Sequence, residues 1–130
     1  MGILFVLVGI GGGLGAMSRF AVTQATASIS KQIPFGIFIC NVIGSLLIGV
    51  IAAFLIKTNL FNEEVSTYTR SLLVTGFLGG FTTFSSFSLD VLNLLQRGEI
   101  FLALGYIFVS ITVSLLAVIL GFYLIMGIYK

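Results

Sequence analysis

The sequence predicts an all-α membrane protein whose chain crosses the bilayer four times. Hydrophobic residues make up 58% of its 130 residues and charged residues only 8%, whereas soluble domains carry about 25% charged residues. Four apolar stretches have the length of about 20 residues that a membrane-spanning helix needs, and the mean hydropathy is +1.24. So few charges cannot cover a globule with a solvated surface, which excludes a soluble fold.

The composition also excludes several kinds of function. The chain contains no histidine, so it lacks the usual general base and the commonest metal ligand. A single cysteine, Cys40, excludes an internal disulfide and a thiolate cluster. The net charge of +2 is too small for a nucleic-acid-binding surface. An enzyme is not expected, because the serines have no base or metal to activate them.

We expect one transmembrane domain over residues 1–130, with helices near residues 3–22, 34–56, 70–95 and 100–128. The first stretch lacks the basic start and the cleavage site of a signal peptide, so it is expected to stay as a helix. Pro34 suits the first turn of the second helix. The third helix follows the polar stretch 57–69 and ends at Arg97 and Gly98, a basic last turn followed by a capping glycine.

Positive charges are divided evenly between the two ends of these helices. One end carries three of them and the other end also carries three: Lys57, Arg70 and Lys130 against Arg19, Lys31 and Arg97. Orientation normally follows an excess of Lys and Arg on the cytoplasmic side, and no excess exists here. One interpretation is that other signals resolve the tie; the other is dual topology, with an antiparallel homodimer.

The third helix contains an unusual run of small and polar residues near its centre. Glycines stand at positions 76, 79 and 80, and five hydroxyl residues fall within positions 82–88. Glycine and threonine weaken a continuous helix, and non-helical backbone in a membrane is tolerated where it is buried in protein or lines a cavity. We expect a break here, although close packing of glycines is the simpler alternative.

In an antiparallel dimer, only segments at mid-depth can meet their own copies. The breaks of two protomers would then face each other, and carbonyl groups freed around Gly79 and Thr82 would form a cage of oxygen atoms. Such a cage suits a hard cation. Because the segment contains no carboxylate, a monovalent ion is more plausible than calcium.

Residues 76–88, GFLGGFTTFSSFS, closely resemble the signature of the Fluc/CrcB family of fluoride channels. The resemblance extends to GGLGAMSRF at residues 12–20, to NVIG at residues 41–44, and to Tyr106, Ser110 and Ser114. It implies a dual-topology homodimer with two fluoride pores. It also implies a central structural sodium ion held by the backbone carbonyls of Gly79 and Thr82.

A fluoride pore must replace water with donors that do not trap the ion. Eight residues are candidates for this pathway: Asn41, Thr83, Phe84, Ser86, Phe87, Tyr106, Ser110 and Ser114. The amide of Asn41 and the hydroxyls offer neutral donors, and the edge of a phenylalanine ring carries positive potential. These residues also have structural interpretations. Asn41 could join two helices by hydrogen bonding, and the hydroxyl stripe formed by Tyr106, Ser110 and Ser114 could be a packing face.

Other conspicuous residues have supporting roles in this interpretation. Arg19 is expected to reach the membrane interface or to cap the break in the third helix. Asp90 is expected near the pore mouth, where it organises donors or is simply solvated. Glycines 9, 12, 13 and 15 are expected at helix contacts.

The expected function is a passive channel that exports cytoplasmic fluoride across a bacterial plasma or inner membrane. Its expected partners are fluoride, sodium, lipid and a second copy of the chain. A small-multidrug-exporter-like antiporter is the alternative, but it would need an acidic residue at mid-membrane. A non-conducting membrane subunit is a third interpretation.

Overall fold

The computed structural model describes residues 1–57 and 63–128. The described elements are all helical: α1 (Gly2–Ala25), α2 (Phe35–Lys57), α3 (Glu63–Thr69), the π-helical segment η1 (Arg70–Leu78), α4 (Gly79–Phe81), α5 (Phe84–Gln96) and α6 (Ile100–Ile128). The run from α3 to α5 makes up one span, so four apolar helices are long enough to cross a membrane. The protein is all-α, as predicted.

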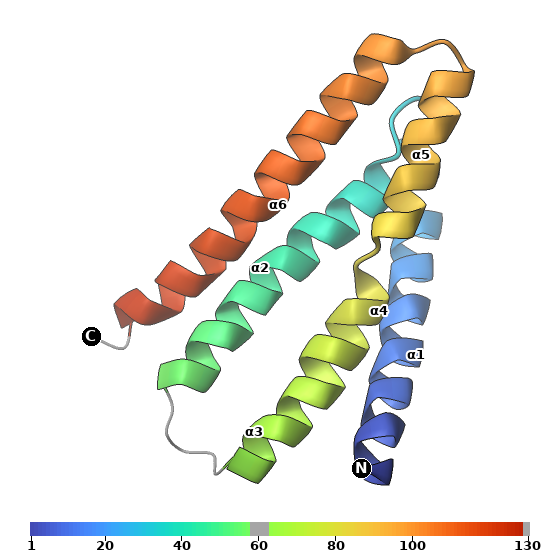
Figure 1. Cartoon of the computed structure of the whole chain (residues 1–130). Helices are drawn as coiled ribbons and strands as arrows, with labels where there is room; N and C mark the ends of the chain where they lie inside the picture. The colour runs from blue at the N-terminus through green and yellow to red at the C-terminus, as the bar shows by residue number, and fades with distance from the viewer. Residues whose placement is uncertain (58–62, 129–130) are drawn as a thin grey trace.

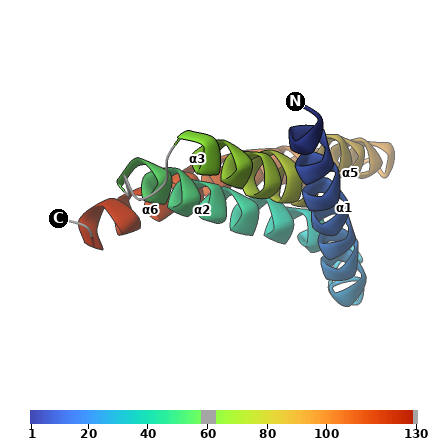
Figure 2. The same cartoon turned by 90° about the horizontal axis from the view of Figure 1, so that it is seen from below.

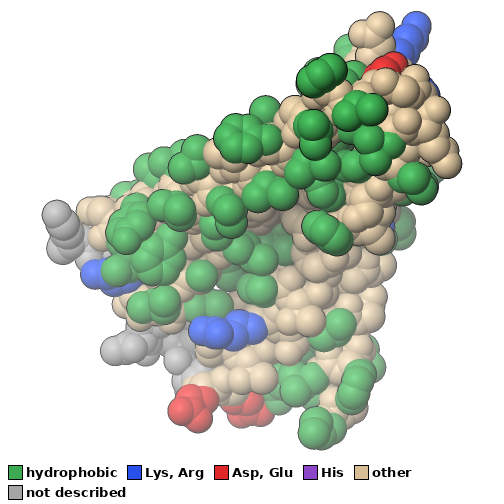
Figure 3. All heavy atoms as spheres, turned by 45° about the horizontal axis from the view of Figure 1, so that its top comes forward, with side chains coloured by type: hydrophobic (Ala, Val, Ile, Leu, Met, Phe, Trp, Pro, Cys, Tyr) green, Lys and Arg blue, Asp and Glu red, His purple; other side chains and the backbone are tan. Residues whose placement is uncertain are grey.

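The four spans lie in two neighbouring pairs. In Figure 1, α2 runs beside α6, and α1 runs beside η1 and α4. Figure 2 shows α2, α3 and α6 in a shallow layer, which α1 crosses at a steep angle. The core is correspondingly thin: the largest fully buried side chains are Leu78, Leu94 and Cys40. On the face in Figure 3, hydrophobic side chains predominate and acidic side chains lie at the two ends.

The third span begins earlier than the sequence predicted. The stretch 57–69 was expected to be a polar connection, yet its last seven residues form α3. Glu63 and Glu64 lie in the first turn of this helix, where carboxylates interact favourably with the helix dipole. The Tyr68 hydroxyl also donates to Glu64 Oε1 at 2.7 Å. The polarity of this stretch therefore did not predict that its last seven residues are helical.

The end of α5 has the cap that its sequence predicted. Gly98 has a φ of +75°, a left-handed conformation that glycine adopts without steric cost. The amide of Gly98 donates to the Leu95 carbonyl at 2.9 Å, and the amide of Glu99 donates to the Leu94 carbonyl at 3.0 Å. This pair of bonds is a Schellman motif, and it turns the chain back into α6.

Close contacts between α1 and the third span depend on glycine, and the glycines involved match the predicted set only in part: Gly15 is confirmed as a close contact. A Cβ atom at Gly11 would overlap the Leu72 carbonyl oxygen, and one at Gly15 would overlap the Phe77 carbonyl oxygen. Added Cβ atoms at Gly9 and Gly13 would meet nothing within 4 Å. The expectation was therefore wrong for Gly9 and Gly13 within this chain. Gly11, which the sequence analysis did not single out, is a principal contact.

Candidate functional site

The third span breaks at Thr82 and Thr83, between α4 and α5. Thr82 has φ −83° and ψ 153°, and Thr83 has φ −157° and ψ 123°. Both residues are extended, so two residues interrupt the helix at the threonine pair inside the predicted motif. Thr83 also starts α5, because its Oγ1 accepts a hydrogen bond from the Ser86 amide at 3.2 Å.

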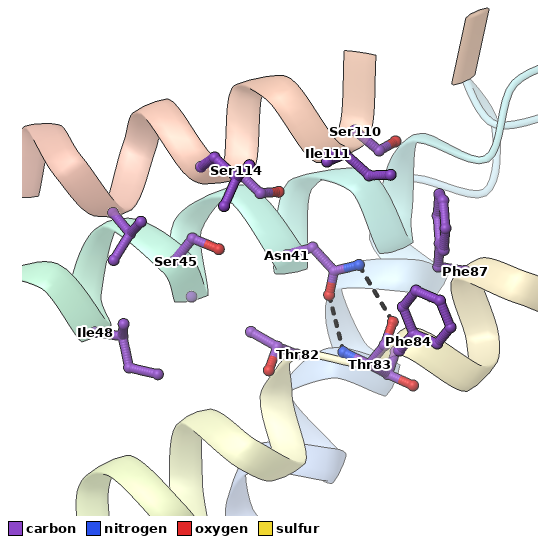
Figure 4. A pocket seen from close by; sticks show the side chains of 13 residues that line it. Asn41, Ser45, Ile48, Thr82, Thr83, Phe84, Phe87, Ser110, Ile111 and Ser114 are labelled. Carbon is purple, nitrogen blue, oxygen red and sulfur yellow. Dashed lines mark hydrogen bonds between the residues drawn. The ribbon is translucent and has the colours of Figure 1, made fainter. Parts of the chain in front are cut away.

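Asn41 on α2 pairs with the backbone of this break. Its Oδ1 accepts from the Thr83 amide at 2.8 Å, and its Nδ2 donates to the Thr83 carbonyl at 3.2 Å. Figure 4 shows both bonds reaching from α2 to the extended segment. Unpaired backbone groups are costly in a membrane, so one side chain stabilises both polar groups of the interrupted residue. One Nδ2 hydrogen remains for another acceptor.

This pairing changes the hydrogen bonding of the preceding carbonyls. In a continuous helix the Thr83 amide would donate to the Gly79 carbonyl and the Ser86 amide to the Thr82 carbonyl. Here these amides donate to Asn41 Oδ1 and to Thr83 Oγ1 instead. The Gly79 and Thr82 carbonyls therefore lack the helical donors that would otherwise occupy them.

A groove of about 370 Å³ opens beside the break, between α2, α5 and α6. Its predicted members are Asn41, Thr83, Phe84, Phe87, Ser110 and Ser114. None of the described residues that line it is charged. The Ser110 side chain is 5% exposed, and its hydroxyl oxygen has no hydrogen-bond partner within the described chain. The groove therefore offers neutral polar groups on an apolar background.

The two phenylalanines sit at one side of this groove. Their ring centroids are 5.6 Å apart and the rings are tilted by 47°. Phe84 is 76% exposed in the single chain, whereas Phe87 is 7% exposed and packs on Tyr106 at 5.4 Å. Phe84 thus presents its ring outward, and Phe87 forms part of the wall.

Five predicted site residues lie outside the groove lining: Arg19, Gly79, Ser86, Asp90 and Tyr106. The Tyr106 hydroxyl donates towards the Pro34 carbonyl at 3.5 Å and towards Asp90 Oδ2 at 3.4 Å. The Ser86 hydroxyl lies 3.4 Å from Thr83 Oγ1. Arg19 lines neither this groove nor the polar cavity that contains Asp90.

Sequence reasoning also missed several residues of the groove, namely Gly44, Ser45, Ile48, Ile111, Leu115 and Val118. Ser45 follows Asn41 by four residues, and this helical spacing could have identified it. Gly44 is needed for close approach, because a Cβ atom there would overlap the Thr82 side chain. The apolar members carry no signal that distinguishes them from lipid-facing residues.

Comparison with known proteins shows which family this chain belongs to. Residues 6–122 match the family described as CrcB-like protein, Camphor Resistance (CrcB). The chain is 78% identical over its full length, and over theirs, to proteins of Francisella tularensis strain SCHU S4 and Francisella philomiragia. It is 39% identical to a protein of Desulfotalea psychrophila, over 92% of this chain and 89% of that one. All three are named fluoride-specific ion channel FluC. This multi-pass membrane chain belongs to the CrcB/FluC family of fluoride-specific ion channels.

Proposed function

We propose that this protein is a channel that conducts fluoride passively out of the cell along the groove beside the helix break. The uncharged lining is the observation that carries the proposal. A Lys or Arg in the groove would hold a small anion too tightly for rapid conduction, whereas many weak donors let it move on. Ser110 supports this view, because it brings an uncharged hydroxyl group to the groove lining.

We assign the pathway to Asn41, Thr83, Phe84, Phe87, Ser110 and Ser114, with Tyr106 and Ser86 as supporting members. Phenylalanine contributes through the positive edge of its ring, which attracts an anion. The antiporter alternative lacks support, because none of the described residues lining the groove is acidic. Asp90 lies instead in a separate polar cavity.

The working unit of this proposal is an antiparallel homodimer. Most of the single chain lies in a shallow layer (Figure 2), and its core is thin. Figure 1 places the end of α2 and the start of α3 at one end, with the starts of α2 and α6 at the other. Described positive charges therefore occur at both ends, while Lys130 lies outside the described residues.

A structural sodium ion at the dimer centre is part of the same proposal. The carbonyls of Gly79 and Thr82 have lost their helical donors, which suits them to a hard cation that prefers oxygen ligands. Two carbonyls cannot complete the coordination shell of such an ion, so a second copy would supply the others. Within the described chain, no group of three His, Cys, Asp or Glu residues is placed to hold a metal, which favours a monovalent ion.

Fluoride flux from liposomes tests the proposed function. Purified protein is expected to release trapped fluoride much faster than chloride, measured with ion-selective electrodes. Phe87→Ile is expected to lower the fluoride rate about two- to thirteenfold, since an aromatic contact worth about 0.5–1.5 kcal/mol is lost. The matched control is Phe108→Ile, on a 71% exposed side chain that lines neither cavity. Absence of fluoride release by the parent protein would refute the proposal.

Sodium withdrawal tests the ion and the dimer together. Protein prepared throughout in potassium at equal ionic strength is expected to dissociate more readily in detergent, because a ligand that binds only the dimer stabilises it by mass action. Chemical crosslinking gives the dimer fraction, and readdition of sodium should restore it. A dimer fraction and a flux that do not depend on sodium would contradict the assignment of the ion.

A further inference from the structure

We infer that η1 is a register joint, a wide helical turn that holds one residue more than an α-helix would and that lets α3 move along its axis while the helix break stays in place. The segment extends over nine residues, Arg70–Leu78, directly before α4. Such π-helical segments are rare and occur often at functional sites. None of the described residues that line the groove or the polar cavity belongs to η1, so the proposed pathway does not account for its geometry.

The backbone hydrogen bonding changes from π to α just before the break. The Gly79 amide donates to the Val74 carbonyl, five residues earlier, and also to the Gly76 carbonyl. The Thr82 amide donates to the Leu78 carbonyl, four residues earlier, at 2.9 Å. A bond to the fourth preceding residue is typical of the α-helix, and a bond to the fifth is typical of the π-helix. The extra residue of the wide turn therefore lies before Gly79.

The facing helix α1 marks the position of the extra residue more closely. A Cβ atom at Gly11 would overlap the Leu72 carbonyl oxygen and lie 2.8 Å from the Phe77 amide nitrogen. A Cβ atom at Gly15 would overlap the Phe77 carbonyl oxygen and lie 2.8 Å from the Phe81 amide nitrogen. The two glycines are four residues apart, whereas the two carbonyls are five residues apart. The third span thus uses one residue more than α1 across the same contact, between Leu72 and Phe77.

The two ends of η1 are held very differently. On the side of the break, Leu78 and Phe81 are buried. A Cβ atom at Gly80 would overlap the Gly12 carbonyl oxygen, and Asn41 pairs with the backbone of the break. On the other side, none of the seven residues of α3 is buried in the single chain. Movement at η1 therefore displaces α3 rather than the break.

Conversion of the wide turn to an α-helical turn defines this movement. The extra residue would leave the turn and join the helix before it, so α3 would move away from the break by about 1.5 Å and rotate by about 100°, the rise and rotation of one α-helical residue. Leu73 would then take the place of Leu72 beneath Gly11. Packed helices shift between discrete positions of about this size in other proteins. The bonds of Asn41 to the break are the same in both forms, so movement of α3 does not displace the proposed fluoride groove.

Deletion of Leu73, a 39% exposed residue of η1, tests the joint. The Leu72 carbonyl then stands four residues before Phe77, so an α-helical turn can form beneath both glycines. We expect the melting temperature in detergent to stay within about 3 °C of that of the parent protein. Amide hydrogen exchange across η1 and α3 should slow at least about tenfold, because the turn can no longer open.

The matched control is deletion of Leu14, which is 51% exposed and lies on α1 between the two contact glycines. This deletion leaves Gly11 and Gly15 three residues apart, so they can no longer both meet the third span. The melting temperature is expected to fall by at least about 8 °C. Both deletions remove one exposed leucine from the same contact, and only the one in η1 removes the extra residue.

The outcomes separate a joint from a fixed turn. A stable Leu73 deletion with slower exchange supports the joint, and a stable one with unchanged exchange overturns it. If the Leu73 deletion is as unstable as the Leu14 deletion, deletion of Thr75 decides, because Thr75 is also exposed and lies between Leu72 and Phe77. Instability of both η1 deletions overturns the joint. These measurements do not use fluoride flux, so failure of the proposed channel function would be seen separately.

Discussion

Replacing Asn41 with leucine is expected to abolish fluoride flux and to lower the free energy of unfolding by about 2 kcal/mol or more. Asn41 makes both hydrogen bonds to the backbone of Thr83. Leucine has a similar size but cannot hydrogen-bond, so the amide and the carbonyl of Thr83 would both lose their partner. Each buried group left unsatisfied costs about 1–3 kcal/mol. The break that orients Phe84 and Phe87 would then lose its anchor.

Two matched variants separate the roles of Asn41. Asn41→Asp keeps the acceptor for the Thr83 amide, but an ionised carboxylate loses the donor to the Thr83 carbonyl and adds the cost of a charge within the membrane, so its stability should fall at least as far as that of Asn41→Leu. Ser45→Ala removes a hydroxyl one turn along the same groove, and its free energy of unfolding should change by no more than about 0.5 kcal/mol. Flux is measured in liposomes and unfolding in detergent. If Asn41→Leu matched the parent in stability, the backbone pairing would be energetically unimportant.

Gly15→Ala is expected to lower the free energy of unfolding by about 1–3 kcal/mol, the usual cost of overpacking a close contact. The added methyl group would overlap the Phe77 carbonyl oxygen and crowd the Phe81 amide. Both are backbone atoms, so no side chain can rotate away to make room. The helices would have to separate just before the break, and fluoride flux should fall with stability.

Gly13→Ala is the control for this prediction. It lies two residues away on α1, where an added Cβ atom meets nothing within 4 Å. The substitution should leave the free energy of unfolding unchanged or raise it by up to about 1 kcal/mol, because alanine is the better helix former. Thermal unfolding in detergent compares the two variants. Equal losses at both positions would show that the contact between α1 and η1 does not depend on glycine.

Much of the groove could be predicted from the sequence because its polar residues stand out in an apolar chain. Asn41, Ser110 and Ser114 interrupt hydrophobic helices, and Phe84 and Phe87 belong to a long and specific motif. The function of Asn41 was harder to predict. Its amide was expected to serve the anion, whereas the structure commits most of its hydrogen bonds to the backbone of Thr83. The sequence left both roles of Asn41 open: binding the anion and hydrogen bonding between helices.

Tyr106 shows a second limit of what helical spacing in the sequence can predict. Its spacing of four residues from Ser110 places both on one helix face, and this predicted a shared hydroxyl stripe. In the structure, Ser110 lines the groove, while the Tyr106 hydroxyl lies outside it, near Asp90 and Pro34. A long side chain ends far from its own Cα atom. Helical periodicity places the residue on a face but does not place the end of the side chain.

The sequence by itself determined the properties that depend on composition and on local pattern. Scarce charge implied a membrane fold, long apolar runs implied four spans, and the run of glycine and threonine implied the break. Only the tertiary structure decided which residues meet across helices: Asn41 with Thr83, Gly11 and Gly15 with η1, and Arg97 with the loop after α1. The physical reason is that these contacts join positions far apart in the chain. Their partners depend on how helices cross and rotate, and no local pattern encodes that geometry.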